Sequence, residues 1–66
     1  MSVAKTAEIT ASSSKSFEDA IEKGVKKMAE TVKGIEGAWI KEQKVVVSDG
    51  KVTAYRVTMK ITFIVK

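Results

Sequence analysis

The sequence contains no cysteine and no histidine, and it has one tryptophan, one tyrosine and one arginine among its 66 residues. Without cysteine it cannot form the disulfide framework that small secreted domains use, and a Cys/His zinc site is excluded. A chain of this length buries only about 60% of the surface that its unfolded form exposes. Self-association is therefore the remaining common way to stabilise such a fold.

Groups suited to catalysis are equally scarce. No serine is paired with a plausible base, and the acidic residues of the helical segment read as helix-stabilising surface charges. The glycines at positions 24, 34, 37 and 50 are too scattered to form a phosphate-binding loop. The carboxylates lack the dense spacing of a calcium loop. The sequence favours a binding or structural protein over an enzyme, and it predicts no metal site.

No apolar run approaches the roughly 18 residues that a membrane-spanning helix needs, and the first residues lack the apolar core of a signal peptide. We therefore expect a cytoplasmic protein without membrane association. The net charge of +4 is compatible with anionic partners, although lysine commonly serves only to solubilise a surface. Beyond Trp39 and Tyr55 there is no aromatic platform for nucleic acid, so we expect no nucleic-acid partner.

Hydrophobic periodicity predicts four elements in the order strand, helix, strand, strand. Residues 3–10 alternate as an edge strand, and the serine-rich residues 11–15 are typical of a loop. Ser16 followed by Asp19 predicts the start of a helix, whose apolar residues then recur every three or four positions. Gly34 is predicted to end this helix.

The second half of the chain predicts a long hairpin. Strands at residues 38–47 and 52–66 flank Asp49 and Gly50, a dipeptide that strongly favours a type I′ turn. Three consecutive valines at residues 45–47 interrupt the alternation of the first strand, and a β-bulge would explain the interruption.

The simplest assembly of these elements is one α+β domain over residues 1–66. It has β-α-β-β order and a three-stranded antiparallel sheet, with the helix packed across one face. Gly24 in the middle of the helix costs about 1 kcal/mol relative to alanine, and its lack of a side chain would allow close packing of another element.

Trp39 lies on the side of its strand that one small subunit would not bury. Since side chains of a strand alternate in direction, Ala38 and Ile40 point to the core and Trp39 points away from it. A large aromatic side chain there indicates a partner, either another subunit or a flat ligand. The residues predicted to share its face are Lys41, Gln43, Arg56, Thr58 and Lys60.

Several stretches, in order along nearly the whole chain, carry a family resemblance. They are residues 8–13 (EITASS), 17–21 (FEDAI), 29–32 (AETV), 39–43 (WIKEQ) and 49–63 (DGKVTAYRVTMKITF). Together with the length and the order of elements, they resemble the dodecins, small proteins that assemble into hollow spheres of twelve subunits. The resemblance implies a homododecameric cage that stores a flavin (riboflavin, FMN or FAD) by aromatic stacking at subunit interfaces.

The sequence departs from the flavin-binding dodecins at two positions. In those proteins a tryptophan at the start of the second strand stacks on the flavin ring, and a glutamine after the tyrosine of the third strand hydrogen-bonds it. Here Gly37 stands at the tryptophan position, Trp39 follows two residues later, and Arg56 replaces the glutamine after Tyr55. A shift of two residues keeps the same face but moves the ring by roughly 7 Å. An arginine at this place also resembles the calcium dodecins, which lack the flavin tryptophan.

The resemblance implies a cofactor site that contains Trp39, Lys41, Gln43, Lys44 and Arg56. Trp39 would stack on a planar ligand or anchor a subunit interface. Arg56 would pair with a phosphate or with a carboxylate such as Glu42, or it would stack on Trp39. Lys44 aligns with a basic position that contacts nucleotide phosphate in the family. The alternative is a structural or ion-binding cage without flavin, similar to the calcium dodecins, in which Trp39 and Arg56 serve only assembly.

Overall fold

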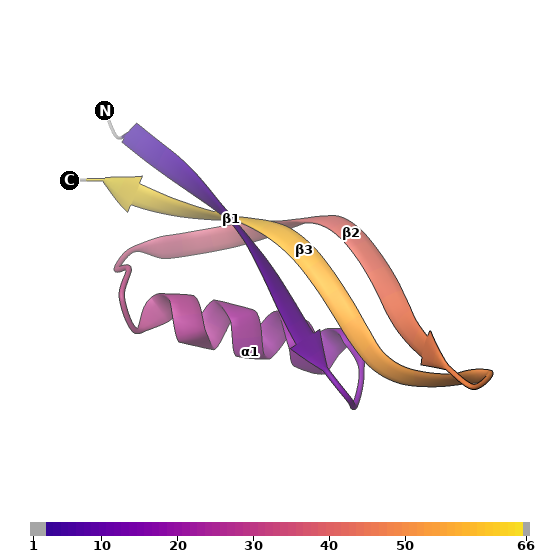
Figure 1. The fold of residues 1–66 in the computed structure, drawn as a ribbon. Helices are drawn as coiled ribbons and strands as arrows, with labels where there is room; N and C mark the ends of the chain where they lie inside the picture. Colours follow the sequence, from indigo (N-terminus) through magenta and orange to yellow (C-terminus); the bar gives the residue numbers. More distant parts are fainter. Residues whose placement is uncertain (1–2, 66) are drawn as a thin grey trace.

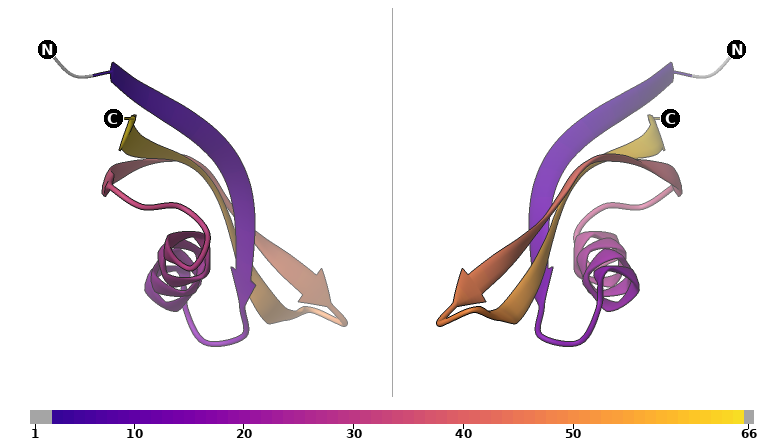
Figure 2. Two further views of the ribbon diagram at one scale, coloured as in Figure 1. Left: turned by 90° about the vertical axis from the view of Figure 1, so that its left-hand side faces the viewer. Right: turned by 90° about the vertical axis from the view of Figure 1, so that its right-hand side faces the viewer.

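The computed structural model describes residues 3–65 and contains the four elements in the predicted order (Figure 1). These elements are β1 (Val3–Ser13), α1 (Phe17–Ala29), β2 (Ile35–Ser48) and β3 (Lys51–Val65). The strands form one antiparallel sheet in the order β1-β3-β2. Figure 2 shows α1 on one side of this sheet, with the strands curving over it. The predicted α+β fold is confirmed, while residues 1, 2 and 66 of the predicted domain and last strand lie outside the described residues.

Ser16 begins α1 as predicted, because its hydroxyl accepts a hydrogen bond of 3.0 Å from the backbone N–H of Asp19. The Asp19 carboxylate accepts from the Ser13 hydroxyl and lies 3.1 Å from the Lys23 ammonium. Ser13 itself is paired with Tyr55 of β3. The predicted loop at residues 11–15 is therefore wrong for residues 11–13, because pairing with β3 carries β1 as far as Ser13.

The helix ends at Ala29, earlier than predicted. The backbone N–H groups of Thr31 and Val32 both donate to the Met28 carbonyl, at 3.1 and 2.9 Å, and the chain turns there. Gly34 has the positive φ of 80° expected of a helix-ending glycine, but it lies in the connection to β2. Its carbonyl accepts a 3.0 Å hydrogen bond from Ile64, so Gly34 joins β3 instead of ending the helix.

The apolar stripe of the helix packs on the middle strand. Val57, Met59 and Ile61 of β3 are completely buried, together with Ala20 of α1. The partly buried residues around them are Ile9, Ala11, Phe17, Ile21, Val25, Met28, Ile35, Ile40 and Phe63. The side of β3 that carries Val57, Met59 and Ile61 therefore forms part of the hydrophobic core.

Gly24 permits this close approach of α1 to the sheet, as its position suggested. A Cβ atom at Gly24 would lie 2.5 Å from the terminal methyl of Met59 and 3.0 Å from the Cβ of Ala11. Real Cβ atoms are essentially never found as close as the first of these distances. The loss of helix propensity at this glycine is the cost of bringing the helix against β1 and β3.

The hairpin turn has the predicted form, since Asp49 and Gly50 both have positive φ, at 55° and 74°. β2 is irregular, with register shifts between Ile35 and Gly37, between Ile40 and Glu42, and between Val46 and Val47. The last shift lies at the valine run, near which a bulge was predicted, but its extra residue is Thr53 of β3, since Val46 pairs with Ala54 and Val47 with Val52. The other two shifts were not predicted. In Figure 1 the far end of the hairpin extends beyond the helix.

We expect a large side chain at position 24 to destabilise the fold. Gly24→Leu should lower the free energy of unfolding by about 1–3 kcal/mol, because overpacking forces Met59 or the helix to move. Urea denaturation at one fixed protein concentration measures the change. Gly37→Ala is the matched control, since a Cβ there meets no atom within 4 Å. Equal stability of Gly24→Leu and Gly37→Ala would contradict the packing role of Gly24.

We also expect Asp19 to make stability depend on pH. The hydrogen bond from Ser13, aided by Lys23, lowers the pKa of Asp19 below its ordinary value of 3.8. The ionised carboxylate therefore adds stability above pH 3.8, and this contribution is lost as the pH falls through the lower pKa of the folded protein. Thermal melts from pH 6 down to about 2 should show a shallower loss for Asp19→Asn than for the native protein. Parallel curves for the two proteins would show that Asp19 does not act in this way.

Candidate functional site

A row of three directly paired residues crosses the sheet on the side away from α1. Glu8 of β1 pairs with Lys60 of β3, and Lys60 pairs with Trp39 of β2. Lys60 lies between the buried residues Met59 and Ile61, so it points away from the core, and its cross-strand neighbours point the same way. We call this side, marked by Glu8, Lys60 and Trp39, the open face.

Trp39 is prominent on the open face because its side chain stays 65% exposed. The Lys60 ammonium lies 5.4 Å from the centre of the indole ring, within the range of a cation–π contact. Stacking on Trp39 was one role considered for Arg56, but Lys60 occupies the position directly opposite the ring. Arg56 is farther along β3 by roughly 13 Å, at the rise of an extended strand.

A salt bridge over β3 accompanies this contact. The Lys41 ammonium lies 3.2 Å from a carboxylate oxygen of Glu8, so a side chain of β2 reaches one of β1. Both side chains are about half exposed, and the pair is worth at most about 1 kcal/mol. The salt bridge also occupies the Glu8 carboxylate, which lies directly opposite Lys60. Within residues 3–65 Lys60 itself makes no salt bridge.

The register shift in β2 changes which residues share the open face. β2 pairs Ile40 with Met59 but Glu42 with Thr58, so Lys41 has no partner of its own on β3. An extra residue of this kind is a β-bulge, and it reverses the alternation of sides for every residue that follows.

As a result, Gln43 and Lys44 each lie on the opposite side of the sheet from the one that strict alternation predicts. Gln43 pairs with the buried Val57, so it lies on the helix side, and its predicted place beside Trp39 is wrong. Lys44, which strict alternation would put on the helix side, pairs with Arg56 on the open face. The structure thus brings Trp39 and Lys41 together with Lys60, and it places Lys44 with Arg56 farther along the same face.

The open face has more cations than carboxylates around the tryptophan. Its cations are Lys41, Lys44, Arg56 and Lys60, and the carboxylates beside them are Glu8 and Glu42. Since Glu8 is already paired with Lys41, the charge left over next to the ring is positive. Such a surface can hold an aromatic ring by stacking and a phosphate or carboxylate by its cations.

The residue that sequence reasoning did not include in the site is Lys60. Alternation along the last strand put Lys60 on the correct face. Its position opposite Trp39 follows from the hairpin, because counting back from the pair Ser48 and Lys51 at the turn reaches Trp39 opposite Lys60, and the extra residues Thr53 and Lys41 offset each other there. The predicted turn at Asp49 and Gly50 was therefore the signal that could have placed Lys60 beside Trp39.

No group of three or more His, Cys, Asp or Glu residues comes together within the part of the chain that the structure describes. Likewise, no helix within residues 3–65 is long and apolar enough to cross a membrane.

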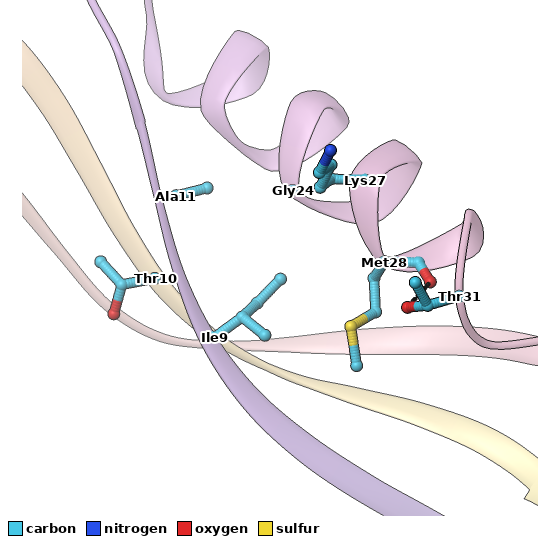
Figure 3. Close-up of a pocket in the computed structure, with 7 residues that line it drawn as sticks. All are labelled: Ile9, Thr10, Ala11, Gly24, Lys27, Met28 and Thr31. Atoms are coloured by element: carbon cyan, nitrogen blue, oxygen red, sulfur yellow. Dashed lines mark hydrogen bonds between the residues drawn. The ribbon is translucent and has the colours of Figure 1, made fainter.

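A separate hollow of about 310 Å³ lies between β1 and α1 (Figure 3). Its lining residues are Ile9, Thr10, Ala11, Gly24, Lys27, Met28 and Thr31. The Thr31 hydroxyl is already occupied as a donor to the Met28 carbonyl at 3.3 Å. None of the predicted site residues lines this hollow, so it is distinct from the open face.

The fold is that of a small protein with β-α-β-β order, in which one long antiparallel sheet curves over a single helix. The Dodecin family model matches residues 3–66, and the chain belongs to the dodecin family. The family resemblance noted from the sequence is thereby confirmed. No curated protein matches the sequence.

Solved structures of dodecins have the same fold. The dodecin from Streptomyces davaonensis is 22% identical with a TM-score of 0.93, and the match covers 98% of this chain and 96% of that one. A variant of Thermus thermophilus dodecin is 21% identical with a TM-score of 0.94, covering 100% and 98%. The calcium dodecin from Mycobacterium tuberculosis, described as having a novel calcium-binding site, is 29% identical with a TM-score of 0.84, covering 97% and 91%.

Proposed function

We propose that this protein assembles into a hollow homododecamer that binds and sequesters a flavin by stacking on Trp39 at subunit interfaces. The observation that carries the proposal is the indole ring of Trp39, 65% exposed on a sheet face where cations are in excess. A flavin has a flat aromatic ring system, and FMN and FAD add phosphate groups at the end of a flexible chain.

Exposure of so large an aromatic side chain favours a partner. Removing apolar surface from water contributes about 25 cal/mol per Å², and aromatic stacking adds to this. A dodecamer would bring a second copy to the open face, so a ring could be held between side chains of two subunits. Self-association also meets the stability requirement of a short chain without disulfides.

The remaining predicted site residues would differ in their roles. Lys44 and Arg56, paired farther along the open face, would contact the more distant phosphate of a longer ligand such as FAD. Lys41 would position Glu8 and add positive charge next to the ring. Gln43 would not take part from this subunit, since it lies on the helix side. Stacking on tryptophan would quench the excited flavin by electron transfer, which gives sequestration a protective purpose.

Flavin titration tests the proposal. Adding the purified apo-protein to riboflavin or FMN should quench flavin fluorescence with saturation, and the protein should run in solution at twelve times its subunit mass. Trp39→Ala should weaken binding by roughly 5- to 150-fold, the equivalent of about 1–3 kcal/mol for one lost stacking contact. Unchanged flavin emission in a large excess of protein would refute flavin binding.

Trp39→Phe is the matched control because it keeps a flat ring of smaller area. We expect its affinity to lie between those of the native protein and Trp39→Ala. The mass of each variant must be measured with the same samples, so that loss of ligand is separated from loss of assembly. If both variants bind flavin as tightly as the native protein, Trp39 is not the stacking residue.

The second candidate function is an ion-binding or structural cage without flavin. The observation that favours it is the 29% identity to the calcium dodecin, together with Gly37 at the usual tryptophan position. Because the described residues of one subunit bring no three carboxylates together, a calcium site would have to combine carboxylates from more than one subunit.

This second candidate makes opposite predictions in the same experiments. The purified protein should be colourless, flavin emission should stay unchanged, and isothermal titration with Ca²⁺ should release or absorb heat with saturation. Trp39→Ala should dissociate into smaller species on sizing, because the ring would serve only the interface. A fully assembled Trp39→Ala that has lost flavin would exclude this candidate.

A further inference from the structure

The Lys60 ammonium, 5.4 Å from the centre of the Trp39 ring, occupies space that a stacking ligand would also approach. Lys60 is half-buried, and it is directly opposite Trp39 in the strand register. Its stem is therefore held by the sheet, and its charged end stays beside the ring. A planar ligand that stacks on Trp39 would therefore contact the Lys60 ammonium.

The neighbouring salt bridge explains why Lys60 turns to the ring. Glu8 of β1, the strand on the opposite side of β3 from β2, is also directly opposite Lys60 and could form a salt bridge with it. The Glu8 carboxylate is instead held by Lys41 at 3.2 Å, a contact that the bulged position of Lys41 permits. Lys60 is left beside Trp39 without a salt bridge to any carboxylate among the described residues.

We infer that Lys60 is a specificity-determining residue that makes Trp39 select planar ligands carrying negative charge. The inference rests on the proposed function, since it concerns ligands that stack on Trp39. A neutral ring must displace the Lys60 ammonium from the indole, and it has no negative charge with which the ammonium could form a new ion pair. A ring with an anionic group returns an ion pair to the displaced ammonium.

The expected size of the effect follows from the strength of exposed cation–π contacts. Loss of such a contact changes an equilibrium by about two- to fivefold. The Lys60 contact should therefore weaken a neutral ring by about this factor, whereas the new ion pair should offset or exceed the loss for an anionic ligand. Selectivity is the ratio of the two affinities, and removal of Lys60 should change both in opposite directions.

Riboflavin and FMN are suitable probes, because they share one ring system and differ by a phosphate. Kd values for both should be measured with the native protein, Lys60→Gln, Lys60→Arg and Lys26→Gln, at low and high salt. We expect the ratio of the riboflavin Kd to the FMN Kd to fall about two- to fivefold or more in Lys60→Gln and to stay near native in Lys60→Arg. Lys26→Gln removes the same charge from the exposed side of α1 and should leave the ratio unchanged.

A measurement without flavin separates this inference from the proposed function. Trp39 is the only tryptophan of the chain, so tryptophan fluorescence reports on this site alone. With both constants normalised to those of free tryptophan, iodide should quench the native protein more strongly than caesium does, because the field of Lys60 attracts the anion. Lys60→Gln should lower the iodide quenching constant and raise the caesium constant, and Lys26→Gln should change neither.

The outcomes are distinguishable. Flavin binding with a Kd ratio and quenching constants that Lys60→Gln leaves unchanged would overturn the inference and retain the proposed function. Absence of flavin binding in every variant, with iodide preference that depends on Lys60, would refute the flavin proposal and support the anionic selectivity of the site. An equal change in Lys26→Gln would show that net charge acts without any role for Lys60.

Discussion

The alternation of side chains along β3 is the constraint on which the rest of this structure depends. β3 pairs with both other strands, so its own direction of alternation is imposed on β1 and β2. Val57, Met59 and Ile61 bind it to the helix, and the residues between them must then face away. A slip of one residue would place Lys60 in the core, at a cost of several kcal/mol that is comparable with the stability of a small domain. The apolar core thereby fixes the charges of the open face.

The bulge at Lys41 modifies this constraint at one place, with consequences for chemistry. It lets Lys41 reach Glu8 over the middle strand, and it turns Lys44 towards Arg56. Bulges commonly lie near functional sites because they redirect side chains without breaking the sheet. In this chain, one extra residue decides which cations surround Trp39 and which of them remains without a carboxylate.

Local signals predicted most of the fold, because hydrophobic periodicity, the Ser16 cap and the Asp49-Gly50 turn act over a few residues. They failed where distant residues decide the outcome. Ser12 and Ser13 are typical loop residues, but in the structure they pair with β3. Gly34 is typical of a helix end, but its carbonyl accepts a hydrogen bond from Ile64 of β3. The face of Trp39 was correctly predicted. The face of Gln43 was not, since the unpredicted bulge at Lys41 reverses the sides of the residues that follow it.

The position of the last strand in the middle of the sheet also determines the order of folding. The β2–β3 hairpin closes through a tight turn and can form from neighbouring residues. β1 instead pairs with β3 between positions as distant as Val3 and Val65, so this pairing closes a much longer loop. During synthesis β1 leaves the ribosome before its partner β3, and its apolar side chains stay exposed until β3 has been made. The few large hydrophobic residues and the lysine of β1 suit such a delay, since they limit aggregation of the waiting strand.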